Sequence, residues 1–298
     1  MSTSSIQKST RLSRAFSLIE LLVCIAIIAL LIAIALPALS KARQCVRITR
    51  ELAAAQQLMT AYTTYADTNR GRVLTGYPTA AMVSGPVSVT NGVGDRLTGD
   101  LAQRYPWRLA PYLDFNFRGL YQDDRVLADL LVQEETYRSY GVTYDYVVSL
   151  YPSLGLNVAF VGGSERHSEF DPAFIRAYGR VHIERSHEPV RPSNLLVFAS
   201  ARAEVQPALP IPGQPQGFFR LEPPVFGASR GRQWEAAYEE RAPLPGLNSG
   251  FISMRHGGRA VTARFDGHAQ LCSWAEMNDM RLWADQATTP DWGLTPRP

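Results

Sequence analysis

The feature that most constrains the fold of this chain is a long apolar stretch near its N-terminus. From Leu18 to Leu39, the 22 residues include a single charged side chain, Glu20. At about 1.5 Å per residue, a helix of this length spans about 33 Å, enough to cross a bilayer core of about 30 Å. A core helix of a soluble protein normally keeps a polar face over such a length. We therefore predict a transmembrane helix over residues 18–39.

Basic residues flank this stretch on both sides. Residues 1–15 are polar and contain three cations and no acid, namely Lys8, Arg11 and Arg14. We interpret them as a leader rather than a folded element. Four more cations follow the stretch, at Lys41, Arg43, Arg47 and Arg50. Cytoplasmic segments usually carry the excess of Lys and Arg, but both ends of this stretch are positive, so this rule does not by itself decide the orientation.

A cleaved secretory signal is the main alternative for this region. Ala33 and Ala35 have the small-x-small spacing of a signal peptidase site. Against this alternative, the apolar stretch is longer than an ordinary signal core, and it continues without a break into an amphipathic helix. We therefore favour a retained helix.

The same helix is predicted to continue well beyond the apolar stretch. Pro37 favours a kink, because a proline inside a helix removes one backbone hydrogen bond. Beyond it, apolar residues recur at steps of three and four, at Cys45, Ile48, Leu52, Ala55, Met59, Tyr62 and Ala66. Asn69-Arg70-Gly71 supplies a stop signal, with glycine suited to a left-handed cap. We predict one helix over residues 16–69, its second half packed on a head domain.

Residues 70–298 are predicted to form that head, an α+β domain with many loops. A short helix or turn is expected at 106–113, and a second one at 233–241. Strands are expected at 144–150, 157–161, 180–184 and 194–199. Residues 205–245 form a proline-rich loop, since no central strand tolerates so many prolines. Residues 255–274 form a closing hairpin, because Asp266-Gly267 is a strong two-residue turn signal in which both positions need positive φ.

Composition excludes several classes of function. A net charge of +3 and the lack of nucleic-acid-binding motifs argue against a nucleic acid partner. No hydrolase, zinc-protease, nucleotide-binding or dinucleotide-binding motif occurs, so we expect no enzymatic activity. The three cysteines have no metal-site spacing, and a Cys45–Cys272 disulfide stays a minor alternative.

We also expect no cofactor and no metal ion. His256, Asp266 and His268 are best explained as hydrogen-bonding residues of the hairpin, with metal binding as the minor alternative. Calcium is the hard cation to consider, but the dense cluster of Asp and Asn that it requires does not occur.

The carboxylate of Glu20 is the one residue of the apolar stretch that demands compensation. A charged group at the bilayer centre costs about 2.5–3.5 kcal/mol on insertion scales, and less near the interface. A solvated interfacial position is one explanation. The other is a counter-charge at the same depth, which a new α-amino group would supply if the chain were cut before Phe16.

The sequence from Ala15 to Leu21 resembles the cleavage and methylation motif of type IV pilins and type II secretion pseudopilins. The resemblance covers roughly residues 11 to 45 and is specific. It implies that a prepilin peptidase cuts between Ala15 and Phe16 and methylates the new amine. Glu20 and Pro37 take the places of the family's glutamate and helix-bending proline. The family usually has glycine before the cut, so alanine at position 15 predicts slower cleavage.

A looser resemblance covers the head. Tyr65–Arg72, Trp107–Leu113, Arg191–Asn194 and the closing hairpin resemble pseudopilin-like proteins that are numerous in planctomycete-type bacteria. That group has a C-terminal signature of a histidine, nine residues and Asp-Gly, and His256, Asp266 and Gly267 fit this spacing.

These resemblances imply a pilin-like fold, a long N-terminal helix packed on an antiparallel sheet with loop insertions. They imply a structural subunit of a type IV pilus or type II secretion pseudopilus. Its partners would be the prepilin peptidase, other pilin or pseudopilin subunits, an inner-membrane assembly platform and membrane lipid. The chain would cross the inner membrane once, with its leader in the cytoplasm and its head in the periplasm or on an extracellular filament. A membrane-tethered binding protein or enzyme that uses the helix only as an anchor is the alternative.

Overall fold

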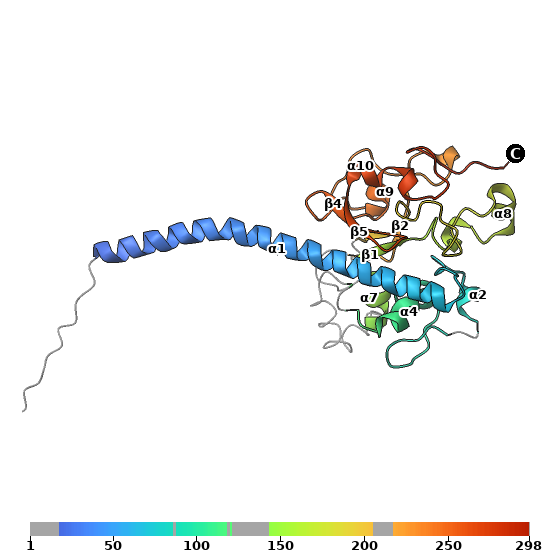
Figure 1. The fold of residues 1–298 in the computed structure, drawn as a ribbon, viewed down its shortest axis with the longest axis horizontal. Helices are drawn as coiled ribbons and strands as arrows, with labels where there is room; N and C mark the ends of the chain where they lie inside the picture. The colour runs from blue at the N-terminus through green and yellow to red at the C-terminus, as the bar shows by residue number, and fades with distance from the viewer. Residues whose placement is uncertain (1–17, 86–87, 118–119, 121–142, 205–216, 298) are drawn as a thin grey trace, which may run out of the picture. The chain divides into compact units, whose positions relative to one another are not determined.

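The computed structural model describes residues 18–85, 88–117, 120, 143–204 and 217–297 (Figure 1). The chain divides into two compact units, and the boundary lies between Arg47 and Ile48. One helix, α1 (Leu18–Thr68), begins in the first unit and ends in the second. The predicted leader lies outside the described residues.

The first unit consists of the N-terminal part of α1. The helix continues without a break through Pro37. It contains a stretch that is long and apolar enough to cross a membrane, and no part of that stretch is buried inside the protein. The apolar side chains of this part are therefore exposed rather than buried among the described residues.

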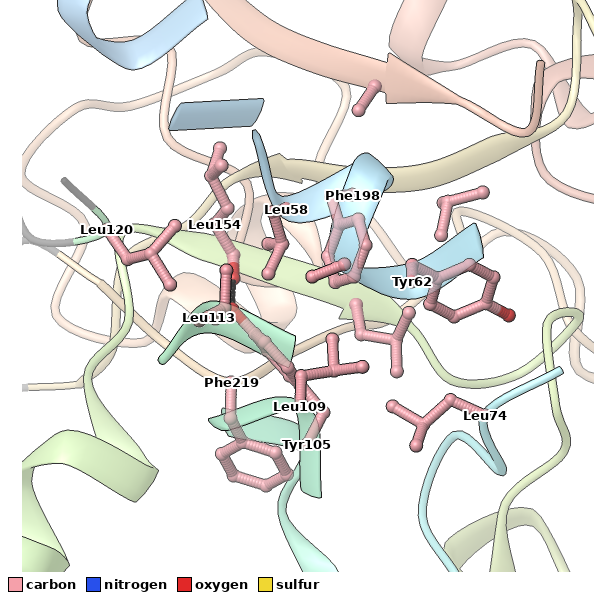
Figure 2. Close-up of a cluster of buried hydrophobic side chains, with 14 of the residues drawn as sticks. Leu58, Tyr62, Leu74, Tyr105, Leu109, Leu113, Leu120, Leu154, Phe198 and Phe219 are labelled. Atoms are coloured by element: carbon pink, nitrogen blue, oxygen red, sulfur yellow. Dashed lines mark hydrogen bonds between the residues drawn. The ribbon is translucent and has the colours of Figure 1, made fainter. Parts of the chain in front are cut away.

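In the second unit, the C-terminal part of α1 packs on the head through one face. The buried residues on this face are Glu51, Ala54, Ala55, Leu58, Met59, Ala61, Tyr62 and Ala66. The stripe predicted from the three-four spacing is thus confirmed from Ala55 onwards, while Ile48 and Leu52 are half-buried and Cys45 is exposed. Figure 2 shows Leu58 and Tyr62 beside Phe198 in the main core. Tyr62 meets Phe198 edge to face, with ring centroids 5.8 Å apart.

A five-stranded sheet forms the centre of the head, with the strand order β3-β1-β2-β4-β5. Its strands are β1 (Leu154–Asn157), β2 (Leu196–Ser200), β3 (Arg220–Leu221), β4 (Arg259–Arg264) and β5 (Ala269–Ser273). Neighbouring strands are antiparallel except for β1 and β3, which run parallel. The α+β fold is therefore confirmed, with a mixed sheet in place of a wholly antiparallel one.

Both faces of this sheet are covered. One face carries Val197 of β2 and Val261 of β4 in the same core as α1. The other face carries Leu196 and Ala260, which pack with Trp283 of the C-terminal segment. Because both faces are buried, β1 and β2 consist of buried residues throughout.

Short helices complete the head and are, in chain order, α2 (Ala80–Val83), α3 (Asp100–Gln103), α4 (Tyr105–Leu109), η1 (Ala110–Leu113), α7 (Tyr144–Leu150), η3 (Glu165–His167), α8 (Pro172–Tyr178), η4 (Ala228–Arg230), α9 (Pro245–Ser249), α10 (Trp274–Met277) and η5 (Met280–Leu282). The helix or turn predicted at 106–113 corresponds to α4 and η1. Tyr105 at the start of α4 donates a hydrogen bond to the backbone oxygen of Leu154 in β1, at 2.6 Å (Figure 2).

The predicted end of α1 is confirmed. The helix ends at Thr68, and Arg70 and Gly71 follow with positive φ. The backbone N–H of Gly71 donates to the oxygen of Ala66 at 2.8 Å, which satisfies one of the carbonyls left unpaired at a helix end.

The closing hairpin is confirmed in its strands and corrected in its turn. β4 and β5 pair in antiparallel register from Arg259 with Ser273 to Ala263 with Ala269. Of the two turn residues, Gly267 has positive φ, at 93°, whereas Asp266 does not. A single left-handed position at the glycine is therefore enough to reverse the chain here.

Two predicted elements were wrong because tertiary contacts outweighed local preference. Residues 144–150 form helix α7 rather than a strand, and Thr143 caps it by accepting a hydrogen bond from the N–H of Tyr146. Residues 233–241 form no helix. Instead, the ring of Trp234 stacks on Trp274, and its Nε1 donates to the backbone oxygen of Glu222.

Of the remaining strand predictions, the one at 194–199 is confirmed by β2 (Leu196–Ser200), and the other two were too long. At 157–161 only Asn157 belongs to β1, because its side chain donates to the backbone oxygens of Leu196 and Trp283 and the chain then turns away. At 180–184 the pairing shrinks to one isolated bridge between Ile183 and Val161. The three cysteines are free, so no Cys45–Cys272 disulfide is present.

Candidate functional site

A single carboxylate interrupts the buried face of α1 in the head. Glu51 lies one residue before Leu52 and four before Ala55, on the face that packs against the sheet. Its side chain is 1% exposed. A buried charge is stable only when it is paired and hydrogen-bonded, so its partners provide a polar contact that holds the helix on the head.

The partners of Glu51 come from strand β2 and from the turn before β4. Oε1 accepts from Arg255 Nη2 at 2.5 Å and from the hydroxyl of Ser200 at 2.7 Å. Oε2 accepts from Arg255 Nε at 3.1 Å and from His256 Nε2 in a short contact. We call these four residues the polar lock. Both carboxylate oxygens are thus occupied twice.

A tight turn explains why two neighbouring residues both reach Glu51. Gly257 and Gly258 have φ values of 64° and 77°, a conformation that glycine adopts readily. The N–H of His256 donates to the backbone oxygen of Arg259 at 3.1 Å, which closes the turn. Arg255 is held further, since its Nη2 donates to the backbone oxygen of Ser153 at 2.7 Å.

Electrostatics keep Glu51 ionised. Burial raises the pKa of the carboxyl, but the charge of Arg255 and hydrogen bonds from His256 and Arg255 outweigh burial and lower the pKa from 4.5 to about 2. The polar lock therefore holds a charged carboxylate at neutral pH. It attaches α1 to the sheet at one fixed register along the helix.

The residues predicted to act in processing and assembly lie in or near the first unit. Ala15 and Phe16 fall outside the described residues. Glu20 lies in α1, and the position of its side chain is not described. Pro37 lies inside α1. The roles of these four residues therefore stay predictions.

The structure separates the predicted signature residues into two groups. His256 contacts Glu51 in the polar lock. Asp266 and Gly267 form the hairpin turn, where Oδ1 of Asp266 accepts from the backbone N–H of His268 at 3.1 Å and contacts its ring Nδ1 at 2.6 Å. The hydrogen-bonding explanation thus fits both histidines, with His256 fastening the helix rather than the hairpin.

A second buried polar cluster lies away from α1. His167 Nε2 contacts Oε2 of Glu222 at 2.7 Å, and its Nδ1 lies 3.6 Å from Oε1 of Glu169. The other oxygen of Glu169 contacts His182 Nδ1 at 2.6 Å. Burial lowers the pKa of His167 to about 4 and raises the pKa of Glu169. These contacts join the loop around η3 to β3 and to the Ile183 bridge.

The side chains of neither cluster are placed as a metal centre. Across residues 18–85, 88–117, 120, 143–204 and 217–297, no group of three or more His, Cys, Asp or Glu side chains is placed to hold a metal ion. What both clusters do chemically is join separate segments through charge-assisted hydrogen bonds.

Comparison with known proteins identifies the N-terminal segment. Residues 10–36 match a family model described as the prokaryotic N-terminal methylation motif. The match supports a type IV pilin-like protein. No curated protein and no solved structure matches the chain. The motif implies processing by a prepilin peptidase and assembly with other pilin subunits, and the apolar helix fits a membrane-anchored protein of this kind.

Reasoning from the sequence missed Glu51, Arg255 and Ser200 as site residues. One signal was available, because Glu51 is the only acid between Leu21 and Ala66 and falls inside the apolar stripe of the helix. An acid at such a position predicts a buried cationic partner. The identity of that partner could not be read from the sequence, because Arg255 lies 204 residues away.

Proposed function

We propose that this chain is a structural subunit of a type IV pilus or type II secretion pseudopilus. A peptidase cuts before Phe16 and methylates the new amine, and the mature subunits assemble through α1. The observation that carries the proposal is the methylation motif at the start of an apolar helix whose apolar stretch is not buried against any of the residues that the structure describes.

The exposed apolar surface of α1 gives the proposal its energetic basis. Fourteen large aliphatic side chains within residues 18–39 are between 48% and 87% exposed. At about 1.5–3 kcal/mol for each buried side chain, covering them is worth on the order of 20–40 kcal/mol. Such a surface does not stay in water. Lipid covers it before assembly, and the helices of neighbouring subunits cover it in the filament.

Glu20 then sets the register between subunits. The methylated amine of Phe16 in one copy and the carboxylate of Glu20 in its neighbour lie at the same depth, so each compensates the other's charge in an apolar surrounding. Within each subunit the polar lock attaches the head to α1 at a fixed register, so the position of the helix sets the position of the head.

This function also assigns location and partners. The leader stays in the cytoplasm, the helix crosses the inner membrane, and the head lies on the periplasmic side. The inner-membrane assembly platform and other pilin or pseudopilin subunits are the protein partners. The head has no catalytic role in this account, and it forms the outer layer of the filament.

The test is a charge reversal at Glu20. The chain is expressed with a prepilin peptidase and an assembly platform, and filaments are sheared from cells and pelleted. Glu20→Lys should abolish pelleting while the tryptophan fluorescence of the head stays unchanged. Glu235→Lys, the same reversal at an exposed head residue, is the control and should assemble normally. Normal assembly of the Glu20→Lys chain would refute the proposed register and favour a simple tether.

A further inference from the structure

Three cations lie immediately after the apolar stretch of α1. Lys41, Arg43 and Arg47 are exposed on the helix, and we call them the basic collar. None of the three forms an ion pair with another residue among those that the structure describes. The sequence contains no acid from Leu21 to Arg50, and Glu51, four residues after Arg47, has its carboxylate oxygens on Arg255 and His256.

Membrane insertion of residues 18–39 places the collar at the depth of lipid headgroups. Its members follow Leu39 by two to eight residues, or about 3–12 Å along the helix axis. The polar layer of a bilayer begins where the hydrocarbon core of about 30 Å ends, and it is several ångströms thick on each side. Long Lys and Arg side chains extend back towards the N-terminus of the helix, and so towards the membrane segment, which brings all three cations within reach of phosphate groups.

The arrangement around the helix distinguishes lipid from a protein partner. Arg43 and Arg47 are four residues apart and lie on one face, whereas Lys41 is rotated by about 200° from Arg43. Cations on opposite faces fit a partner that surrounds the helix. Lipid headgroups surround a membrane helix on all sides, while an acidic patch on a second copy would reach one face.

After processing, the cationic side chains that flank the membrane segment are those of the collar. Cleavage before Phe16 removes Lys8, Arg11 and Arg14, so from residue 16 to residue 47 the collar holds every cationic side chain. Under the proposed orientation these charges lie on the outer side, against the usual excess of positive charge in the cytoplasm. Their placement there calls for a compensating anion.

We propose that the basic collar binds the phosphates of anionic phospholipids in the leaflet that faces the head. This inference rests on the proposed membrane insertion of α1. The arginines bind phosphate oxygens through paired N–H donors, and the lysine binds as a point charge. The collar thereby holds the helix at a fixed depth until assembly extracts it.

Electron paramagnetic resonance of spin-labelled lipids tests the proposal on the full chain. The protein is reconstituted into phosphatidylcholine vesicles with a trace of spin-labelled phosphatidylglycerol or spin-labelled phosphatidylcholine. The measured quantity is the fraction of each label immobilised by protein. One cation near an anionic surface is worth about fivefold in affinity, so we expect at least about a fivefold preference for phosphatidylglycerol, which salt reduces.

Substitutions assign that preference to the collar. The triple variant Lys41→Gln/Arg43→Gln/Arg47→Gln should lose it. The charge-preserving variant Lys41→Arg/Arg43→Lys/Arg47→Lys should keep it. A matched control removes three exposed head cations and should also keep it, namely Arg176→Gln, Arg185→Gln and Arg241→Gln.

The outcomes separate this proposal from the proposed function. Equal immobilisation of both labels by the natural chain overturns the collar while membrane insertion stands. A preference for phosphatidylglycerol that survives the triple variant also overturns the proposed collar. So does a preference that appears only when the protein is diluted in the vesicles, because a second copy would then be neutralising the collar. If neither label is immobilised, the helix does not contact lipid, and the membrane insertion in the proposed function fails as well.

Discussion

Replacing Glu51 by glutamine is the most informative perturbation of the head. The variant keeps the size of the side chain and removes its charge, so Arg255, whose side chain is 9% exposed, loses the carboxylate charge of Glu51. Removing one member of a buried ion pair typically costs 3–5 kcal/mol. The pKa gives a similar figure, because lowering it from 4.5 to about 2 corresponds to about 3 kcal/mol at 1.36 kcal/mol per pH unit.

The sign of the pH dependence follows from the same shift. The pKa of Glu51 is lower in the folded head than in the unfolded chain, so the stabilisation is fully present above pH 4.5. It is lost as the pH falls from about 4.5 towards about 2. The natural chain should therefore be about 3 kcal/mol more stable than Glu51→Gln at pH 7, and the two should converge near pH 2.

Urea unfolding of the full chain in nonionic detergent measures this difference. The tryptophans lie at positions 107, 234, 274, 283 and 292, so their fluorescence reports on the head and not on the membrane segment. Glu235→Gln, at an exposed position, is the matched control and should change stability by less than about 0.5 kcal/mol. A loss below about 1 kcal/mol in Glu51→Gln, or a gap that does not close at low pH, would refute the reasoning.

Three further predictions concern the head. Leu58→Ala should destabilise it by about 2–5 kcal/mol in the same urea assay because Leu58 is fully buried, whereas Thr64→Ala on the exposed face should cost less than about 0.5 kcal/mol. Gly162→Ala should cost more than about 2 kcal/mol, since a Cβ there would overlap a backbone carbonyl oxygen at a φ of 78°. Gly94 has a similar φ, but a Cβ there would meet no neighbouring atom, so Gly94→Ala should cost only about 1–2 kcal/mol. Equal losses of stability in the two variants would contradict the overlap at Gly162. The ring of His167 should stay neutral down to about pH 5 in nuclear magnetic resonance titration, because burial lowers its pKa from 6.5 to about 4. Its contribution to stability should therefore fall as the pH drops from about 6.5 to about 4, and a ring that titrates near 6.5 would contradict this account.

Local patterns predicted the parts of the fold that local physics controls. The length of α1 followed from its apolar stretch and three-four spacing, and its end followed from the capping signal at Gly71. The strands β4 and β5 followed from the turn signal at Asp266-Gly267, because a short connection between two alternating segments favours their antiparallel pairing.

Contacts between distant segments decided the rest. Residues 144–150 have the β-branched and aromatic composition of a strand, yet they form α7 because Thr143 caps the helix and its apolar side chains enter the core. The polar lock joins Glu51 to a turn 204 residues away, and no local pattern specifies that pairing. The processing residues, by contrast, could be predicted because their motif is a contiguous stretch of sequence.

The central claim is that the chain is a processed pilin-like subunit, and mass spectrometry of its mature N-terminus tests this most directly. The protein is purified from cells that also produce a prepilin peptidase. The account predicts a mature chain that begins with N-methylated Phe16, and faster processing in an Ala15→Gly variant. An intact chain beginning at Met1, or a cut after Ala35, would contradict it.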